Sequence, residues 1–133
     1  MSTKDNKNNK HTYNGYFKNH NKFAVAFKGI ATVLKEESSF RYQTLIFFLV
    51  VSLGFILHIT AKEWISIILS TMLVLSLEIM NTSIENIVDL VSEDYHPLAG
   101  KIKDIAAGAV LLASIGAVLV GIIIFYPRIL EMI

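Results

Sequence analysis

Four polar residues interrupt an otherwise apolar stretch in the middle of the chain. Glu78, Asn81, Glu85 and Asp89 follow one another at spacings of three, four and four residues. On a helix these spacings place all four side chains within about 80° of the circumference, as one polar stripe. A carboxylate that faces lipid costs several kcal/mol, so the stripe must face a protein interior, a water-filled cavity or the membrane interface.

The chemistry that this stripe favours is proton transfer beside a hard cation. Asp89, and in part Glu85, also suit a helix end that has already left the membrane, whereas Glu78 lies more than one turn deeper. A carboxylate in water-poor surroundings is suited to accept a proton from a hydroxyl. Paired carboxylates without cysteine favour Mg²⁺ over zinc, and Mg²⁺ in proteins usually accompanies phosphates.

A polar segment at residues 92–104 follows the stripe and could hold a nucleotide phosphate. Its polar and ionisable side chains include Asp94, Tyr95, His96, Lys101, Lys103 and Asp104. Neither a phosphate-binding GxxxxGK[ST] loop nor the motifs of protein kinases are present, which excludes both of those nucleotide-binding architectures. The bland alternatives stay open: His96 before Pro97 equally suits a helix start, and Lys103 with Asp104 equally suits interfacial anchors.

The elements that position these residues are predicted to be membrane-spanning helices. The chain has 133 residues, of which 53% are hydrophobic and 17% charged, with a mean hydropathy of +0.53 and no cysteine. This apolar content exceeds what a small soluble domain can bury. The absence of cysteine excludes a disulfide scaffold. Length and lack of charge predict three spans, at about 42–61, 64–86 and 105–126. Lys62 and Glu63 are expected to form a short connector.

The first 22 residues differ in composition from the rest of the chain. They contain five lysines against one aspartate, many asparagines and few aliphatic residues. We therefore expect a polar tail at 1–22, disordered over at least 1–12 and not a cleaved secretory signal, followed by a membrane domain at 23–133. Phe23, Phe27, Ile30 and Leu34 then recur on one helix face, which predicts an amphipathic helix in the interface or one packed on the bundle.

The distribution of basic residues predicts the orientation. With the N-terminus and the second loop in the cytoplasm and the C-terminus outside, ten basic residues lie inside and only Lys62 and Arg128 lie outside. In the third span Ala109, Ala113, Ala117 and Gly121 form a narrow ridge suited to close helix packing. We expect an all-α membrane protein that self-associates.

Three motifs together resemble a known family. The run Glu-Ile-Met-Asn-Thr-Ser-Ile-Glu-Asn-Ile-Val-Asp (78–89) is followed by Asp-Tyr-His-Pro-Leu-Ala (94–99) and Lys-Asp-Ile-Ala-Ala-Gly-Ala-Val-Leu (103–111), and preceded by Glu-Ser-Ser-Phe-Arg (37–41). This combination resembles the small integral-membrane prokaryotic diacylglycerol kinase and undecaprenol kinase family, over residues 23–127. The second and third motifs are more similar to the Gram-positive undecaprenol kinases.

The resemblance implies a homotrimer in the bacterial plasma membrane that transfers the γ-phosphoryl group of Mg²⁺-bound ATP to a lipid hydroxyl, without a role for nucleic acid. Glu78 is similar to the general base, Asn81 to a substrate contact, and Glu37 and Glu85 to the metal ligands that also contact ATP. The resemblance assigns the family's remaining ATP-binding positions to Lys18, Asp94, Tyr95, His96, Lys103 and Asp104 of this chain. Val25 and Ala26 depart from the tyrosine and serine that some members have there.

Several functions remain to be separated. The residues of the second and third motifs favour undecaprenol as the acceptor. The alternative is a diacylglycerol kinase that makes phosphatidic acid. A small proton-coupled transporter would explain Glu78 but leaves Lys103 and Asp104 without a role. A membrane scaffold would have no use for a buried acidic stripe.

Overall fold

The computed structural model describes residues 21–92, 94 and 96–131, and every regular element within them is an α-helix. The four helices are α2 (Lys22–Glu36), α3 (Ser38–Ile56), α4 (Ala61–Val91) and α5 (Pro97–Leu130). The chain divides into two compact parts between Thr32 and Val33, and each part is described by itself. The tail at 1–20, including the segment expected to be disordered, lies outside the described residues.

The helix expected from Phe23 onward is found as α2. The side-chain oxygen of Asn21 accepts a hydrogen bond from the backbone N–H of Phe23 at 3.1 Å, which satisfies one donor of the first turn. Phe23 and Phe27 both expose most of their surface. The helix therefore presents apolar side chains to its surroundings, and its place in the membrane interface stays a prediction.

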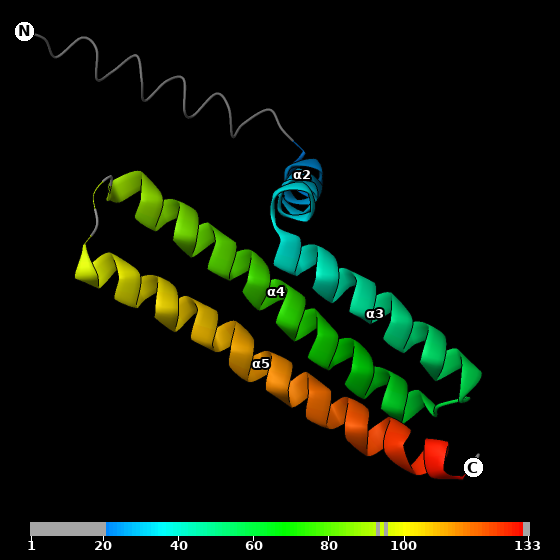
Figure 1. The fold of residues 1–133 in the computed structure, drawn as a ribbon. Coiled ribbons are helices and arrows are strands. Elements are labelled where there is room, and N and C mark those ends of the chain that lie inside the picture. Colours follow the sequence, from blue (N-terminus) through cyan, green and yellow to red (C-terminus); the bar gives the residue numbers. More distant parts are fainter. Residues whose placement is uncertain (1–20, 93, 95, 132–133) are drawn as a thin grey trace, which may run out of the picture. The chain divides into compact units, whose positions relative to one another are not determined.

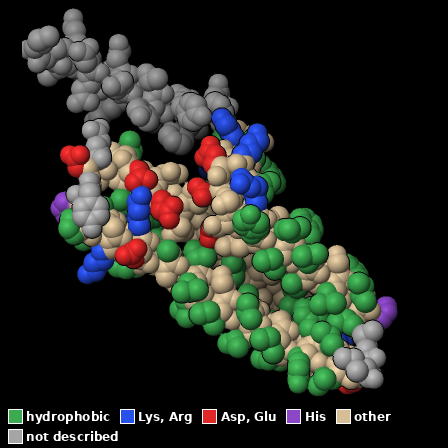
Figure 2. Space-filling model, in the orientation of Figure 1, with side chains coloured by type: hydrophobic (Ala, Val, Ile, Leu, Met, Phe, Trp, Pro, Cys, Tyr) green, Lys and Arg blue, Asp and Glu red, His purple; other side chains and the backbone are tan. Residues whose placement is uncertain are grey.

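Helices α3, α4 and α5 run antiparallel, with α4 between the other two (Figure 1). All three are long and apolar enough to cross a membrane. Most of their large hydrophobic side chains are exposed, and they cover much of the face seen in Figure 2. Such a surface suits lipid rather than water as solvent, so the chain is an all-α membrane protein.

The turn between α3 and α4 lies earlier in the chain than the sequence indicates, at residues 57–60, and the prediction that Lys62 and Glu63 form a connector is wrong. Thr60 and Glu63 form a capping box: the Thr60 hydroxyl accepts from the Glu63 backbone N–H at 3.4 Å, and the Glu63 carboxylate accepts from the Thr60 backbone N–H at 2.7 Å. This box satisfies N–H groups that a helix start otherwise leaves unpaired. Lys62 and Glu63 therefore belong to the first turn of α4.

The same turn is tied to the end of α5. Arg128 donates to the Glu63 carboxylate at 2.6 Å and to the backbone oxygen of Leu57 at 3.4 Å. Beside this cluster lies the buried apolar core, made of Ile59, Ile67, Ile124 and Phe125. Charge and packing together therefore hold the three helices at this end of the molecule.

At the opposite end, α5 begins earlier than the predicted third span. The His96 side chain caps the helix by accepting a hydrogen bond from the backbone N–H of Leu98 at 3.1 Å. Pro97 occupies the first helical position, where the N–H that proline lacks would have no partner within the helix. Lys103 and Asp104 are consequently helical, and the polar loop is reduced to residues 92–96.

The predicted small-residue ridge of α5 is only partly a packing face. The buried residues of α5 are Ala106, Val110, Ile124 and Phe125. Ala113, Ala117 and Gly121 are half-buried, whereas Ala109 is exposed.

Candidate active site

Glu78 is buried between α3 and α4, where it meets a side chain from the neighbouring helix. Only 6% of its surface is exposed. The amide nitrogen Nε2 of Gln43, on α3, donates a hydrogen bond to Oε2 of Glu78 at 3.0 Å. Glu78 thus faces the protein interior, one of the settings that the polar stripe allowed, and not lipid.

One turn further along α4, Asn81 and Glu85 form a second polar pair. The Asn81 side-chain nitrogen donates to Oε1 of Glu85 at 2.9 Å, and both residues are half-buried. The other side-chain atom of Asn81, Oδ1, is buried and has no hydrogen-bond partner within the described part of the chain. An unpaired buried oxygen is costly unless a ligand or ion completes it.

Near the end of α4 a third pair joins α4 to α5. Lys103 contacts Asp89 at 2.6 Å, and the two side chains expose 35% and 66% of their surface. A pair this exposed contributes little to stability. Its consequence is to hold a cationic amine beside the last turns of α4.

The other predicted site residues are more scattered. Asp94 and Asp104 are exposed, His96 is exposed with Nδ1 engaged in the helix cap, and Glu37 is half-buried just before α3. Tyr95 and Lys18 lie outside the described residues.

The structure aligns the three polar pairs along α4 but does not gather them at one point. Eleven residues separate Glu78 from Asp89, a distance of roughly 16 Å at 1.5 Å per residue. Acidic and basic side chains gather toward the end where α4 gives way to α5, away from the apolar remainder (Figure 2). An extended nucleotide could bind along this row of polar pairs on α4, with its phosphates beside them.

The oxygen donors of this row fit Mg²⁺ together with phosphates. In the described ranges no three acidic, histidine or cysteine side chains converge on one point. Mg²⁺ commonly takes only one or two carboxylates and completes its shell with phosphate and water oxygens. Glu85, beside the unpaired Oδ1 of Asn81, supplies donors of that kind.

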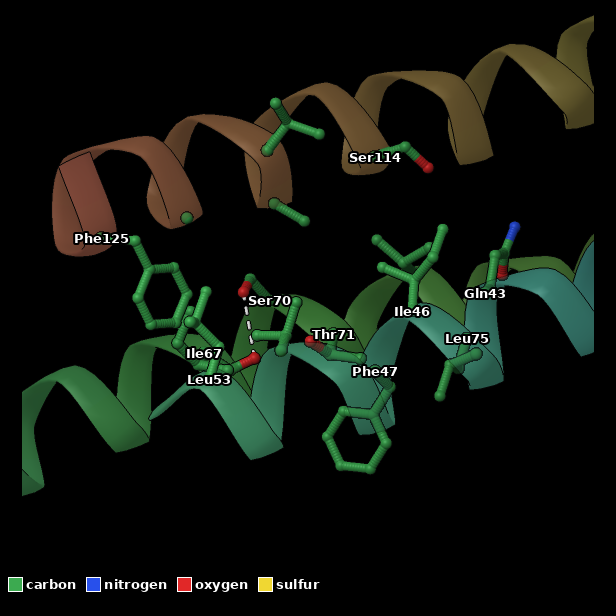
Figure 3. Close-up of a pocket in the computed structure, with 15 residues that line it drawn as sticks. Gln43, Ile46, Phe47, Leu53, Ile67, Ser70, Thr71, Leu75, Ser114 and Phe125 are labelled. Atoms are coloured by element: carbon green, nitrogen blue, oxygen red, sulfur yellow. Dashed lines mark hydrogen bonds between the residues drawn. The ribbon is translucent and has the colours of Figure 1, made fainter. Parts of the chain in front are cut away.

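An apolar crevice reaches Gln43, the hydrogen-bond partner of Glu78. It has a volume of about 250 Å³ and lies among α3, α4 and α5 (Figure 3). Gln43 lines it together with hydrocarbon side chains such as Ile46, Val74 and Phe125. The hydroxyl of Ser70, also in the lining, is engaged by the backbone oxygen of Ile67 at 3.1 Å. The crevice suits a hydrocarbon chain, with its polar end directed at the Gln43–Glu78 pair.

Gln43 is the site residue that the sequence analysis missed. Its signal was weak, because a single amide within an uncharged predicted span is common in membrane helices. Its partner lies 35 residues away on another helix. Only the packing of α3 on α4 reveals the contact.

Three helices that are long and apolar enough to cross a membrane, with a buried carboxylate and an apolar crevice among them, define an integral-membrane protein. The family model of prokaryotic diacylglycerol kinase matches residues 24–125, and the chain belongs to this family. It is therefore a lipid kinase, a phosphotransferase with an alcohol acceptor and ATP as co-substrate, in a bacterial membrane. The transporter and scaffold interpretations are dropped.

Individual relatives agree with this assignment. The chain is 35% identical to the undecaprenol kinase of Bacillus subtilis over 93% of its own length and 98% of that protein. It is 35% identical to the diacylglycerol kinase of Escherichia coli K12, over 77% of its own length and 84% of that protein. It is 39% identical to the diacylglycerol kinase of Synechocystis, but spans only 63% of that longer chain.

Proposed function

We propose that the protein transfers the γ-phosphoryl group of ATP to undecaprenol, with Mg²⁺, at the cytoplasmic face of the membrane. The observation that supports this most directly is the buried carboxylate of Glu78, which accepts a hydrogen bond from Gln43 in the lining of the crevice between the three helices. Similarity to the undecaprenol kinase of Bacillus subtilis over nearly the full length of both chains also favours this acceptor.

Each site residue predicted from the sequence receives a role in this proposal. Glu78 accepts the proton of the lipid hydroxyl and Asn81 contacts the lipid head. Glu37 and Glu85 hold Mg²⁺ and contact ATP, and the other ATP contacts are Lys18, Asp94, Tyr95, His96, Lys103 and Asp104. Bound Mg²⁺ would neutralise charge on the phosphate oxygens, while the protein mainly positions the reactants.

The proposal includes the assembly and its orientation. We take the active form as a homotrimer, with the N-terminus and the α4–α5 loop in the cytoplasm. The excess of basic residues on that side supports this orientation. Glu37 and the polar residues of α4 need not meet within one subunit. The proposal therefore includes an active site that is shared between neighbouring subunits.

Competition between acceptors tests the proposed substrate. The purified protein is offered undecaprenol and diacylglycerol in mixed micelles with radiolabelled ATP and Mg²⁺. We expect undecaprenol to acquire most of the label. Preferential labelling of diacylglycerol would make the protein a source of phosphatidic acid instead, and no labelling of either lipid would contradict the proposal as a whole.

A further inference from the structure

Gln43 joins two features of the molecule, the apolar crevice and the carboxylate of Glu78. It lines the crevice, and its Nε2 donates to Oε2 of Glu78 at 3.0 Å. Its side-chain oxygen Oε1 is buried and has no hydrogen-bond partner among the described residues. One amide therefore has a satisfied donor and an unsatisfied acceptor at the same place.

The partner of Glu78 is a neutral amide, as is Asn81 beside Glu85, whereas two other acidic side chains contact a cation. Asp89 is paired with Lys103, and Glu63 is paired with Arg128. An ionised carboxylate only accepts hydrogen bonds, whereas a protonated one also donates. A cation could satisfy only the first form, but an amide can satisfy both.

The geometry of an amide makes this exchange possible without moving the helices. A half-turn about the terminal side-chain bond exchanges Nε2 and Oε1, so the acceptor takes the place of the donor beside Glu78. The hydrogen bond from Gln43 engages Oε2 alone, so the other carboxylate oxygen of Glu78 is the one that would face the substrate hydroxyl. The unpaired Oε1 is thus accounted for as an acceptor that is needed only after proton transfer.

We propose that Gln43 is a positioning residue for Glu78, which presents its N–H to the carboxylate before phosphoryl transfer and its Oε1 to the carboxylic acid afterwards. This inference rests on the proposed function. The lipid hydroxyl gives its proton to Glu78, and its oxygen forms a bond to the γ-phosphorus. The bond from that phosphorus to the β–γ bridging oxygen breaks, and ADP leaves with the electron pair. Glu78 then releases the proton to water as the product leaves.

Steady-state kinetics of Gln43→Met test the role in the reaction. Methionine has nearly the length of glutamine but neither a donor nor an acceptor. We expect kcat to fall by about tenfold or more, less than the loss of the base itself, with KM for ATP and lipid nearly unchanged. Thr44→Val is the matched control, because the Thr44 hydroxyl donates to Phe40 on its own helix at 2.7 Å. It should keep wild-type kcat.

The outcomes separate the inference from the proposed function. A wild-type protein that transfers phosphate and a Gln43→Met variant that matches its kcat would overturn the inference alone. A fall in kcat with an equal fall in the amount of folded protein, or a rise only in KM, would also overturn it. A wild-type protein that phosphorylates neither lipid would overturn the proposed function, and with it the role of Gln43 in the reaction.

A second readout does not depend on activity. In the full-length ¹⁵N-labelled protein, the side-chain amide signals of Gln43 are assigned by their loss in Gln43→Met. We expect these signals to shift in Glu78→Gln, because the charged acceptor has gone, and to stay in place in Thr44→Val. Signals that do not move in Glu78→Gln would overturn the contact between the two side chains.

Discussion

At the scale of single residues, the charged pair of Lys103 and Asp89 illustrates how little some contacts contribute to stability. Both side chains are substantially exposed, so solvent screens their attraction. The proposed nucleotide phosphates would compete with Asp89 for the same amine, because phosphate oxygens accept strong charge-assisted hydrogen bonds from ammonium groups. The pair is therefore suited to open when ATP binds.

Amine labelling measures whether Lys103 contacts the nucleotide. We expect a non-hydrolysable ATP analogue with Mg²⁺ to slow the labelling of Lys103 severalfold, while labelling of the exposed Lys101, two residues earlier, is unchanged. The two rates are read by mass spectrometry of the same digest. Equal labelling of Lys103 with and without the nucleotide would contradict its proposed role.

At the residue scale, the sequence predicted what lies on one helix and missed what joins two. The stripe of Glu78, Asn81 and Glu85 follows from helical spacing, and the structure places those residues in one polar row along α4. Gln43 has no such periodic signal, because its significance comes from a partner on α4. The sites that need contacts between elements are the ones that spacing cannot reveal.

At the scale of the elements, the reversal between α3 and α4 depends on one close approach. A Cβ added at Gly54 would lie 2.9 Å from Cη2 of Trp64 and 3.0 Å from Cδ1 of Ile59. The indole ring is rigid and half-buried, so it has little room to move. A residue without a side chain is required where α3 meets the start of α4.

Gly54→Ala should therefore destabilise the protein. Overpacking of this kind costs about 1 to 3 kcal/mol, which lowers the unfolding midpoint in detergent. Gly116→Ala is the control, because nothing lies within 4 Å of a Cβ there and alanine favours a helix by up to about 1 kcal/mol. Equal stability of the two variants would show that Gly54 is not closely packed.

The helices themselves were predictable and their ends were not. Hydropathy and length indicate three apolar helices, as found. The ends are set by capping: Thr60 with Glu63 starts α4, and His96 with Pro97 starts α5. These caps lie in polar segments, where an apolar pattern carries no information, so Lys62, Glu63, Lys103 and Asp104 were placed outside the helices that contain them.

At the scale of the whole molecule, a single chain leaves much of its apolar surface exposed and its polar row extended. Lipid can cover the exposed apolar surface. The half-buried side chains of Asn81 and Glu85, however, need protein or ligand beside them. The proposed homotrimer would supply neighbouring helices, and residues such as Glu37 from a second subunit.

Mixing inactive subunits tests a shared site. Glu37→Gln and Glu78→Gln are each expected to be inactive, because one lacks a proposed metal ligand and the other the base. If a site takes Glu37 and Glu78 from different subunits, refolding the two variants together should restore part of the wild-type phosphate transfer. An inactive mixture, when wild-type subunits refolded under the same conditions are active, would place both residues in one subunit.

The most direct test of the central claim compares wild-type protein and Glu78→Gln in ATP- and Mg²⁺-dependent phosphate transfer to undecaprenol in mixed micelles. The substitution keeps the shape of the side chain and removes its ability to accept the proton. We predict that transfer falls by at least about 100-fold, the contribution of a general base, while folding and nucleotide binding are retained. Turnover by Glu78→Gln at a rate near that of the wild type would contradict the role of Glu78 as the base.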